Sequence, residues 1–281
     1  HNRQYRRFVT QAPVRNLQGF IAAPLALSSR VIHGLTLQVA YLPNHQANVQ
    51  MTLDAMAQTV EFLSTHINPY NGKTLTLIEK PDLSPTGYAL PQLILIGSRV
   101  GFRSLQNHVM PYSQAYRRAV HETAHQWFGH ALGNGIGQDS AFLVESLAKY
   151  IELVMLERQQ GQSAMQALVS YEKQRYLNAE QHNRQPMRSL ISAESPHDQY
   201  SRATLVFARL RQAIGDQPIL AALQILGREY SYPKPPASSI DFIQALLNQV
   251  PEQRALIDML FTSQVEPVEW LEQLQLSKEE K

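Results

Sequence analysis

Two histidines four residues apart, with a glutamate directly after the first, constrain this chain more than any other feature. They stand in the stretch His121-Glu122-Thr123-Ala124-His125. On a helix, residues four apart lie one above the other, so both imidazoles can face one cation. Glu122 then lies to one side, where it can hold a water molecule and act as a general base. The pattern predicts a zinc site on a helix, with His121 and His125 as ligands.

The residues around this motif favour a helix. No proline interrupts residues 112–131. Apolar or aromatic side chains recur there every three to four positions, which is the helical period: Tyr116, Val120, Ala124, Trp127 and Ala131. The alternative is an amphipathic helix whose histidines merely lie on its surface. A further donor downstream argues against this alternative.

A catalytic zinc site uses three protein ligands and keeps one position open. Glu145 is the best third donor, on a second expected helix that begins at Asp139 or Ser140 after a glycine-rich loop over residues 133–137. Glu152 follows two turns later on the same face, where it could accept a hydrogen bond from a liganding histidine. For each glutamate the alternative is an ordinary exposed carboxylate.

This combination resembles the aminopeptidase-N-type gluzincin metallopeptidases. The shared features are His-Glu-Thr-Ala-His-Gln-Trp-Phe-Gly at residues 121–129, a glutamate about twenty residues later, and a helix that continues Leu-Ala-Lys-Tyr. The resemblance implies one zinc ion held by His121, His125 and Glu145, with Glu122 as the base. It also implies a thermolysin-like α+β fold, with a mixed β-sheet lobe that includes an edge strand and a mainly helical lobe.

The chain departs from the family near the third ligand. Nineteen residues separate His125 from Glu145, one more than the family's usual spacing, and Val-Glu-Ser at residues 144–146 replaces its Asn-Glu-Gly. One extra residue in a glycine-rich loop is easily absorbed, so Glu145 keeps its expected role.

A later tyrosine stabilises the oxyanion in this family. Residues 198–205, Asp-Gln-Tyr-Ser-Arg-Ala-Thr-Leu, resemble the family's Tyr-x-Lys-Gly helix start. The resemblance implies that Tyr200 donates a hydrogen bond to the carbonyl oxygen as charge develops there. Arg202 and Ala203 replace the family's lysine and glycine. A half-buried core tyrosine is the alternative.

The expected edge strand lacks the family's acidic motif. In the family this strand carries Gly-Ala-Met-Glu-Asn, lies along the substrate backbone and binds its free amino group through the glutamate. Residues 86–92 read Thr-Gly-Tyr-Ala-Leu-Pro-Gln, with no acid. A cationic amino terminus therefore loses a charge-assisted partner. A divergent subset of the family, fused to membrane segments like those of ABC-transporter permeases, also lacks this motif.

The residue pattern predicts the same division into a sheet and helices. Strand-like runs occur at residues 7–10, 20–23, 35–41 and 74–79, and a second extended run covers residues 88–97 with Pro91 at an edge or bend. Helical periods cover residues 49–66, 163–176, 197–214, 218–230, 239–250, 252–261 and 268–275.

We expect two domains. Residues 1–40 read as the β-rich tail of a preceding domain, which suggests a fragment of a longer protein, and residues 41–281 as the catalytic domain. Within the latter we place a sheet lobe at about 41–110, the zinc helices at about 112–160 and a helical lobe at about 161–281.

Composition excludes several other classes of protein. A chain of 281 residues with 44% apolar content can bury a sizeable core. The net charge is +2, and the one small basic cluster consists of Arg3, Arg6 and Arg7. This is too little positive charge to predict a nucleic-acid-binding surface. The absence of cysteine excludes disulfides and thiolate zinc sites. No apolar run in the sequence is long enough to span a membrane.

We therefore expect a zinc metallopeptidase that hydrolyses peptides, while strict aminopeptidase activity stays open. The alternative is a weakly active or inactive zincin-fold domain with a binding or regulatory role in a larger membrane-associated protein. Glu122 favours the enzyme, because an inactive relative needs no base there. The resemblance to the transporter-fused subset implies an extracytoplasmic domain of a membrane protein, with the cytoplasm as the alternative.

Overall fold

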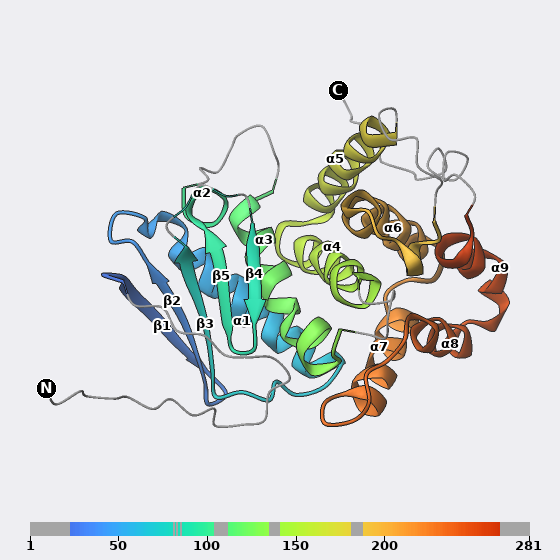
Figure 1. Cartoon of the computed structure of the whole chain (residues 1–281), viewed down its shortest axis with the longest axis horizontal. Helices are drawn as coiled ribbons and strands as arrows, with labels where there is room; N and C mark the ends of the chain where they lie inside the picture. Colours follow the sequence, from blue (N-terminus) through green and yellow to red (C-terminus); the bar gives the residue numbers. More distant parts are fainter. Residues whose placement is uncertain are drawn as a thin grey trace, which may run out of the picture.

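The computed structural model describes residues 23–80, 82, 84, 86–103, 112–134, 141–180 and 188–264. A five-stranded mixed sheet with helices against it forms one lobe, and helices form the other (Figure 1). This arrangement confirms the predicted α+β class.

The sheet has the strand order β1-β2-β3-β5-β4. Its strands are β1 (Ala26–Ile32), β2 (Leu35–Tyr41), β3 (Thr74–Lys80), β4 (Gly87–Leu90) and β5 (Leu93–Gly97). The pairs β2–β3 and β3–β5 are parallel, whereas β1–β2 and β4–β5 are antiparallel. Most apolar side chains of the central strands β2, β3 and β5 are buried or partly buried. This burial explains the Leu-, Val- and Ile-rich sequences of these strands.

The extended run predicted over residues 88–97 is in fact a hairpin. Strands β4 and β5 pair antiparallel, with Leu90 opposite Leu93. Pro91 has no amide hydrogen for a strand ladder, and Gln92 has a positive φ of 63°, which reverses the chain. The reversal places β4 at the edge of the sheet that faces the helical lobe (Figure 1).

Helix α1 (Val49–His66) connects the parallel strands β2 and β3 and matches its predicted bounds. Its apolar face packs on the sheet and on α3 (Gln114–Ala124), the helix that carries the two histidines. Ser113 caps the start of α3, because its hydroxyl accepts a hydrogen bond from the Tyr116 amide at 3.2 Å. The histidine helix is thus fixed at its start and along one side.

The remaining helices cover the predicted helical segments that lie within the described residues, and α2 is a short helix that was not predicted. They are α2 (Ser98–Gly101), α4 (Leu147–Gln160), α5 (Gln162–Glu180), α6 (Ala203–Ile214), α7 (Gln217–Tyr230), α8 (Ser239–Gln249) and α9 (Arg254–Ile257). Short helical turns precede or extend several of them, at Gln46–Asn48, Gln126–Ala131, Phe142–Ser146, Leu190–Ser192, His197–Arg202, Pro251–Gln253 and Asp258–Thr262.

Four phenylalanines form the aromatic centre of the helical lobe. Phe142, Phe207, Phe242 and Phe261 come from four different segments, and their ring centroids lie 5.6 to 6.4 Å apart. All four are almost completely buried. Because Phe142 begins the turn that carries Glu145, this cluster anchors that glutamate to the helical lobe.

Several predictions lie outside the described residues. These are the strand at residues 7–10, most of the strand at 20–23, the helix start at Asp139 or Ser140, and the helix at 268–275. The boundary expected near residue 40 stays a prediction, although β1 and β2 pair into the same sheet as β3. Within the described part of the chain, no helix is long and apolar enough to cross a bilayer.

Candidate metal centre

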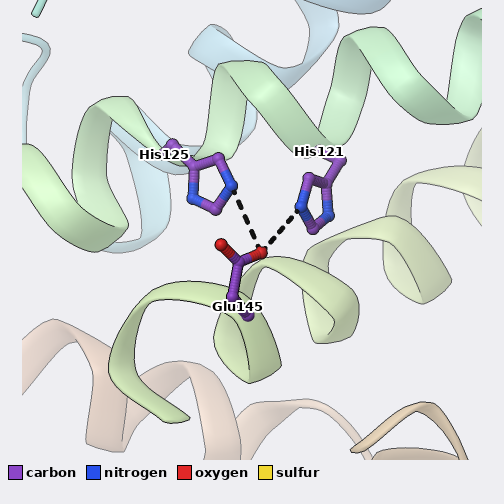
Figure 2. Close-up of side chains that lie close together, drawn as sticks. All are labelled: His121, His125 and Glu145. Atoms are coloured by element: carbon purple, nitrogen blue, oxygen red, sulfur yellow. Dashed lines mark hydrogen bonds and ion pairs between the residues drawn. The ribbon is translucent and has the colours of Figure 1, made fainter. Parts of the chain in front are cut away.

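The structure brings His121, His125 and Glu145 together at the junction of the two lobes. Figure 2 shows the two imidazoles descending from one helix toward a single carboxylate oxygen of Glu145 on the segment below. His121 Nε2 lies 3.2 Å from Glu145 Oε2, and His125 Nε2 lies 3.6 Å from the same oxygen. One donor atom from each residue lies within 4.8 Å of the other two.

These three side chains fit a zinc ion. In a tetrahedral site with bonds of about 2.0–2.1 Å, neighbouring donor atoms lie about 3.3 Å apart. The two distances to Glu145 Oε2 are close to this value. Two imidazoles and one carboxylate are also a donor set that zinc takes in catalytic sites. The Glu145 side chain is 24% exposed, so the site is reachable from solvent.

A kink after α3 orients His125. The chain leaves helical geometry at Phe128 and at Gly129, whose φ of 112° favours glycine. His125 Nδ1 lies 3.2 Å from the Phe128 carbonyl oxygen. A proton on Nδ1 donates to that carbonyl, so Nε2 presents its lone pair to Glu145 and the metal position.

Glu152 lies behind His121, where the sequence predicted it. Its Oε1 atom is 2.7 Å from His121 Nδ1, and both residues are almost fully buried. This contact is an ion pair rather than a hydrogen bond, because the Glu152 oxygen lies too far from the direction of the Nδ1–H bond. The carboxylate still fixes a proton on Nδ1 and leaves Nε2 for the metal.

The pKa values of the three donors follow from burial and from their contacts. Burial lowers the pKa of His121, but its contacts with the carboxylates of Glu145 and Glu152 raise it to about 9. Burial and the neighbouring His121 lower the pKa of His125 to about 4. Burial raises the pKa of Glu145, but the hydrogen bond and charge of His121 hold it at about 2. At neutral pH Glu145 is ionised and His125 is neutral, which are the metal-binding forms, whereas His121 is protonated and releases one proton when a metal ion binds.

A second group of charges, which we call the ion cluster, lies directly behind the metal centre. It consists of Arg117, Lys149, Glu152 and Glu172. Lys149 Nζ lies 2.7 Å from Glu152 Oε2 and 3.2 Å from Glu172 Oε1. Arg117 Nη1 lies 3.4 and 3.2 Å from the same two oxygens.

The ion cluster is buried and balanced. Lys149, Glu152 and Glu172 are at most 3% exposed, and the Arg117 side chain is 11% exposed. Burial raises the pKa of Glu152 and of Glu172, but Lys149 and Arg117 hold the pKa of both carboxyl groups below its ordinary value, and that of Glu152 well below it. Arg117, Lys149 and Glu172 were not predicted from the sequence as members of this cluster. The available signal was the pair Lys149 and Glu152, two opposite charges three residues apart in the mainly apolar first part of α4.

Glu122 lies in contact with the edge strand. It is 3% exposed, and burial raises the pKa of its carboxyl group. A Cβ atom at Gly87 of β4 would overlap the Glu122 carboxylate, so a larger residue there would displace that carboxylate from its present position. Arg118, one turn earlier on α3, places its Nη1 atom 3.8 Å from Glu122 Oε1.

Tyr200 lies beside the metal centre, close to His121 and Glu145. Its ring centroid is 5.9 Å from that of His121, and its hydroxyl interacts with the Glu145 carboxylate. Burial and the charge of Glu145 raise the pKa of the Tyr200 phenol above its usual value, so the phenol keeps its proton at neutral pH. The phenol is therefore available as a hydrogen-bond donor beside the metal position.

The site opens into a cleft of about 630 Å³, bordered by β4 on one side and by Tyr200 on the other. The β4–β5 turn is tied to the segment after α3: Gln126 donates to the Leu90 carbonyl and accepts from the Gln92 amide, at 3.0 and 2.8 Å. His130 contacts the Ala89 carbonyl at 3.1 Å. These contacts hold the edge strand over the cleft.

Comparison with known proteins agrees with this geometry. A profile described as the peptidase family M1 domain matches residues 51–262. No curated protein matches the chain.

Solved structures of a zinc metallopeptidase share the fold. The crystal structure of the M1 zinc metallopeptidase from Deinococcus radiodurans has a TM-score of 0.65 and 19% identity, with 87% of this chain and 53% of that chain covered. A mutant of that protein bound to a Tyr-Ser-Ala substrate has a TM-score of 0.66, with the same identity and coverage. At such identity the similarity shows the fold alone. The chain spans about half the length of these structures.

Proposed function

This chain belongs to peptidase family M1, and we propose that it is a zinc-dependent metallopeptidase that hydrolyses peptide bonds. The observation that carries the proposal is the convergence of three metal donors beside a buried glutamate, in a cleft bordered by an edge strand. His121, His125 and Glu145 would hold one zinc ion per chain. When bound, zinc lowers the pKa of a water molecule and polarises the carbonyl group to be cleaved.

Glu122 acts as the general base in this proposal. It removes the proton from the attacking water and passes it to the leaving nitrogen. Its burial supports this role, because the raised pKa of the carboxyl group brings it closer to neutral pH, where a base is most effective. Contact with Gly87 holds the carboxylate beside the edge strand, along which the peptide would lie.

Tyr200 supplies a proton donor on the other side of the cleft. Its phenol stays protonated at neutral pH and donates a hydrogen bond to the carbonyl oxygen as negative charge develops there. Ser201, the next residue, donates to Glu172 at 2.8 Å. This bond ties the start of the Tyr200 segment to the ion cluster and supports the position of the phenol.

The lining of the cleft favours activity that does not depend on a free amino terminus. The acidic side chains among its described residues are Glu122, Glu145, Glu152 and Glu172. Glu145 serves the metal, Glu122 is the base, and the ion cluster neutralises the other two. Strict aminopeptidase activity would need a further carboxylate to bind the cationic amino terminus.

A location in a larger protein remains part of the proposal. The resemblance to the transporter-fused subset supports an extracytoplasmic domain attached to membrane segments, with the cytoplasm as the alternative. The second candidate function is a zincin-fold domain that binds peptides without hydrolysing them. Departures from the family at Val144, Ser146 and Arg202 favour this second candidate.

The test combines metal analysis with a peptide library. We expect about one zinc ion per purified chain, cleavage of library peptides, and loss of that cleavage by about 10²- to 10⁴-fold in Glu122→Gln, with zinc retained. Glu229→Gln, on the exposed surface of α7, is the matched control and should keep full activity. Full activity in Glu122→Gln would refute the assignment of the base. Zinc without any cleavage would favour the binding domain.

A further inference from the structure

Two partly exposed arginines line the cleft. Arg118 lies one helical turn before Glu122 on α3, and its side chain is 25% exposed. Arg175 comes from α5, lines the same cleft and has a side chain that is 40% exposed. These two arginines are more exposed than Arg117 and Glu145, which line the same cleft. The proposed mechanism uses neither arginine.

The described residues of the cleft include four permanent cations: Arg117, Arg118, Lys149 and Arg175. Glu152 and Glu172 face three of them, because Arg175 shares Glu172 with Lys149 and Arg117. One positive charge is therefore left uncompensated there. Arg118 has only the base Glu122 as its partner among the described carboxylates.

Among the residues that the structure describes, neither arginine is fully occupied by its neighbour. The distance of 3.8 Å from Arg118 Nη1 to Glu122 Oε1 is too long for a hydrogen bond. Arg175 Nη1 lies 3.5 Å from Glu172 Oε2, an oxygen that already accepts a shorter bond of 2.8 Å from Ser201. Both guanidinium groups therefore retain donors that could form paired hydrogen bonds with another carboxylate.

The position of Glu122 shows on which side of the cleaved bond Arg118 lies. A base that passes a proton to the leaving nitrogen must face the leaving-group side of the scissile bond. The Arg118 guanidinium lies beside this base, with Nη1 3.8 Å from Glu122 Oε1. Arg118 therefore lies on the same side of the cleaved bond as Glu122, which is the leaving-group side.

We propose that Arg118, assisted by Arg175, forms a subsite for a carboxylate on the leaving-group side of the cleaved bond. The carboxylate belongs either to an acidic side chain directly after that bond or to the carboxyl terminus of a short leaving fragment. Arginine suits this role because its planar guanidinium group can donate one hydrogen bond to each of the two carboxylate oxygens. The inference rests on the proposed function, since it takes its direction from the role of Glu122.

The test uses peptides that differ only after the cleaved bond. The best neutral peptide from the library is resynthesised with Glu, Gln or Lys at that position and an amidated end. A second pair ends one residue after the bond, with a free or an amidated terminus. We expect kcat/KM to be about tenfold or more higher for Glu than for Gln, or for the free than for the amidated terminus. Lys should be the poorest of the three.

Variants then assign the preference to the arginines. In Arg118→Gln the ratio of kcat/KM between the acidic and the neutral peptide should fall to about 1, with a smaller fall in Arg175→Gln. Arg228→Gln removes the same charge from the exposed surface of α7 and should leave the ratio unchanged. If Arg118 merely positioned Glu122, its loss would slow all peptides equally and leave the ratio intact, which would overturn the proposal.

A binding measurement separates this proposal from the proposed function. The same peptides are titrated into the zinc-loaded Glu122→Gln variant with and without Arg118→Gln. Preferential binding of the acidic peptide that depends on Arg118 would support the subsite even if the chain hydrolysed nothing. Hydrolysis without any carboxylate preference would refute the subsite and leave the peptidase intact.

Discussion

The metal centre and the ion cluster are adjacent, both are largely buried, and they meet at the contact between His121 and Glu152. They differ in how their charges are balanced. In the ion cluster two cations face two carboxylates, so the chain itself compensates the cost of burial. In the metal centre three donor groups converge on one point that only a bound cation completes.

Because of this difference, the ion cluster contributes to stability and the metal centre contributes to function. A balanced buried cluster holds its helices in a fixed arrangement, whereas an incomplete one is a binding site. Here the first supports the second, because Glu152 belongs to the ion cluster and also contacts a metal donor. The two regions should therefore respond differently to the loss of one member.

The largest effect should follow from the loss of a metal donor. Glu145→Ala leaves two imidazoles, which are too few for a catalytic zinc site. We expect zinc content to fall from about one ion per chain to background, and hydrolysis to fall with it. Metal analysis and a peptide assay measure both. Retained zinc in this variant would mean that another residue is the third ligand.

The ion cluster should respond in stability rather than in metal content. Lys149→Met leaves Glu152 and Glu172 buried with Arg117 as their remaining cluster cation, and we expect unfolding free energy to fall by about 3–5 kcal/mol. Urea unfolding of the zinc-loaded chain measures this loss. In the control Lys80→Met, the lost partner is Asp82 at 2.9 Å on the surface, and we expect a loss of at most about 1 kcal/mol. Equal losses would contradict the difference between buried and exposed charges.

A smaller effect, confined to turnover, should follow from Tyr200→Phe. The variant keeps the ring and loses only the hydroxyl, so we expect zinc content to stay unchanged while kcat falls by about 10²-fold. Tyr230→Phe is the control, because that hydroxyl bonds to Asp241 on α8, away from the cleft. An unchanged rate in Tyr200→Phe would assign the oxyanion donor to another residue.

The smallest effect should be a change in acid stability. Burial raises the pKa of Glu172, but Lys149 and Arg117 hold it below its ordinary value in the folded chain. Its contribution to stability is therefore complete above that ordinary value and is lost as the pH falls through the folded value. We expect Glu172→Gln to reduce the slope of unfolding free energy against pH below about 4.5 by at most about 1.4 kcal/mol per pH unit. Unfolding of chelator-treated protein at several pH values measures this slope. A variant with an unchanged slope would contradict the lowered pKa.

The sequence determined those features that depend on local spacing. Histidines four apart on a helix share a face whatever surrounds them, so His121 and His125 could be paired from the chain alone. Glu152, two turns after Glu145, was placed by the same periodicity. The helices predicted at residues 49–66, 197–214 and 218–230 followed from their apolar period, and the mixed sheet followed from the resemblance.

The tertiary structure decided what depends on segments far apart in the chain. The ion cluster joins α3, α4 and α5, and no local pattern relates Arg117 to Glu172, 55 residues later. The hairpin at Pro91 and the contact of Gly87 with Glu122 depend on how the sheet docks against the histidine helix. Local geometry repeats along a chain, but the pairing of distant charges depends on which segments pack together, and packing is a property of the whole fold.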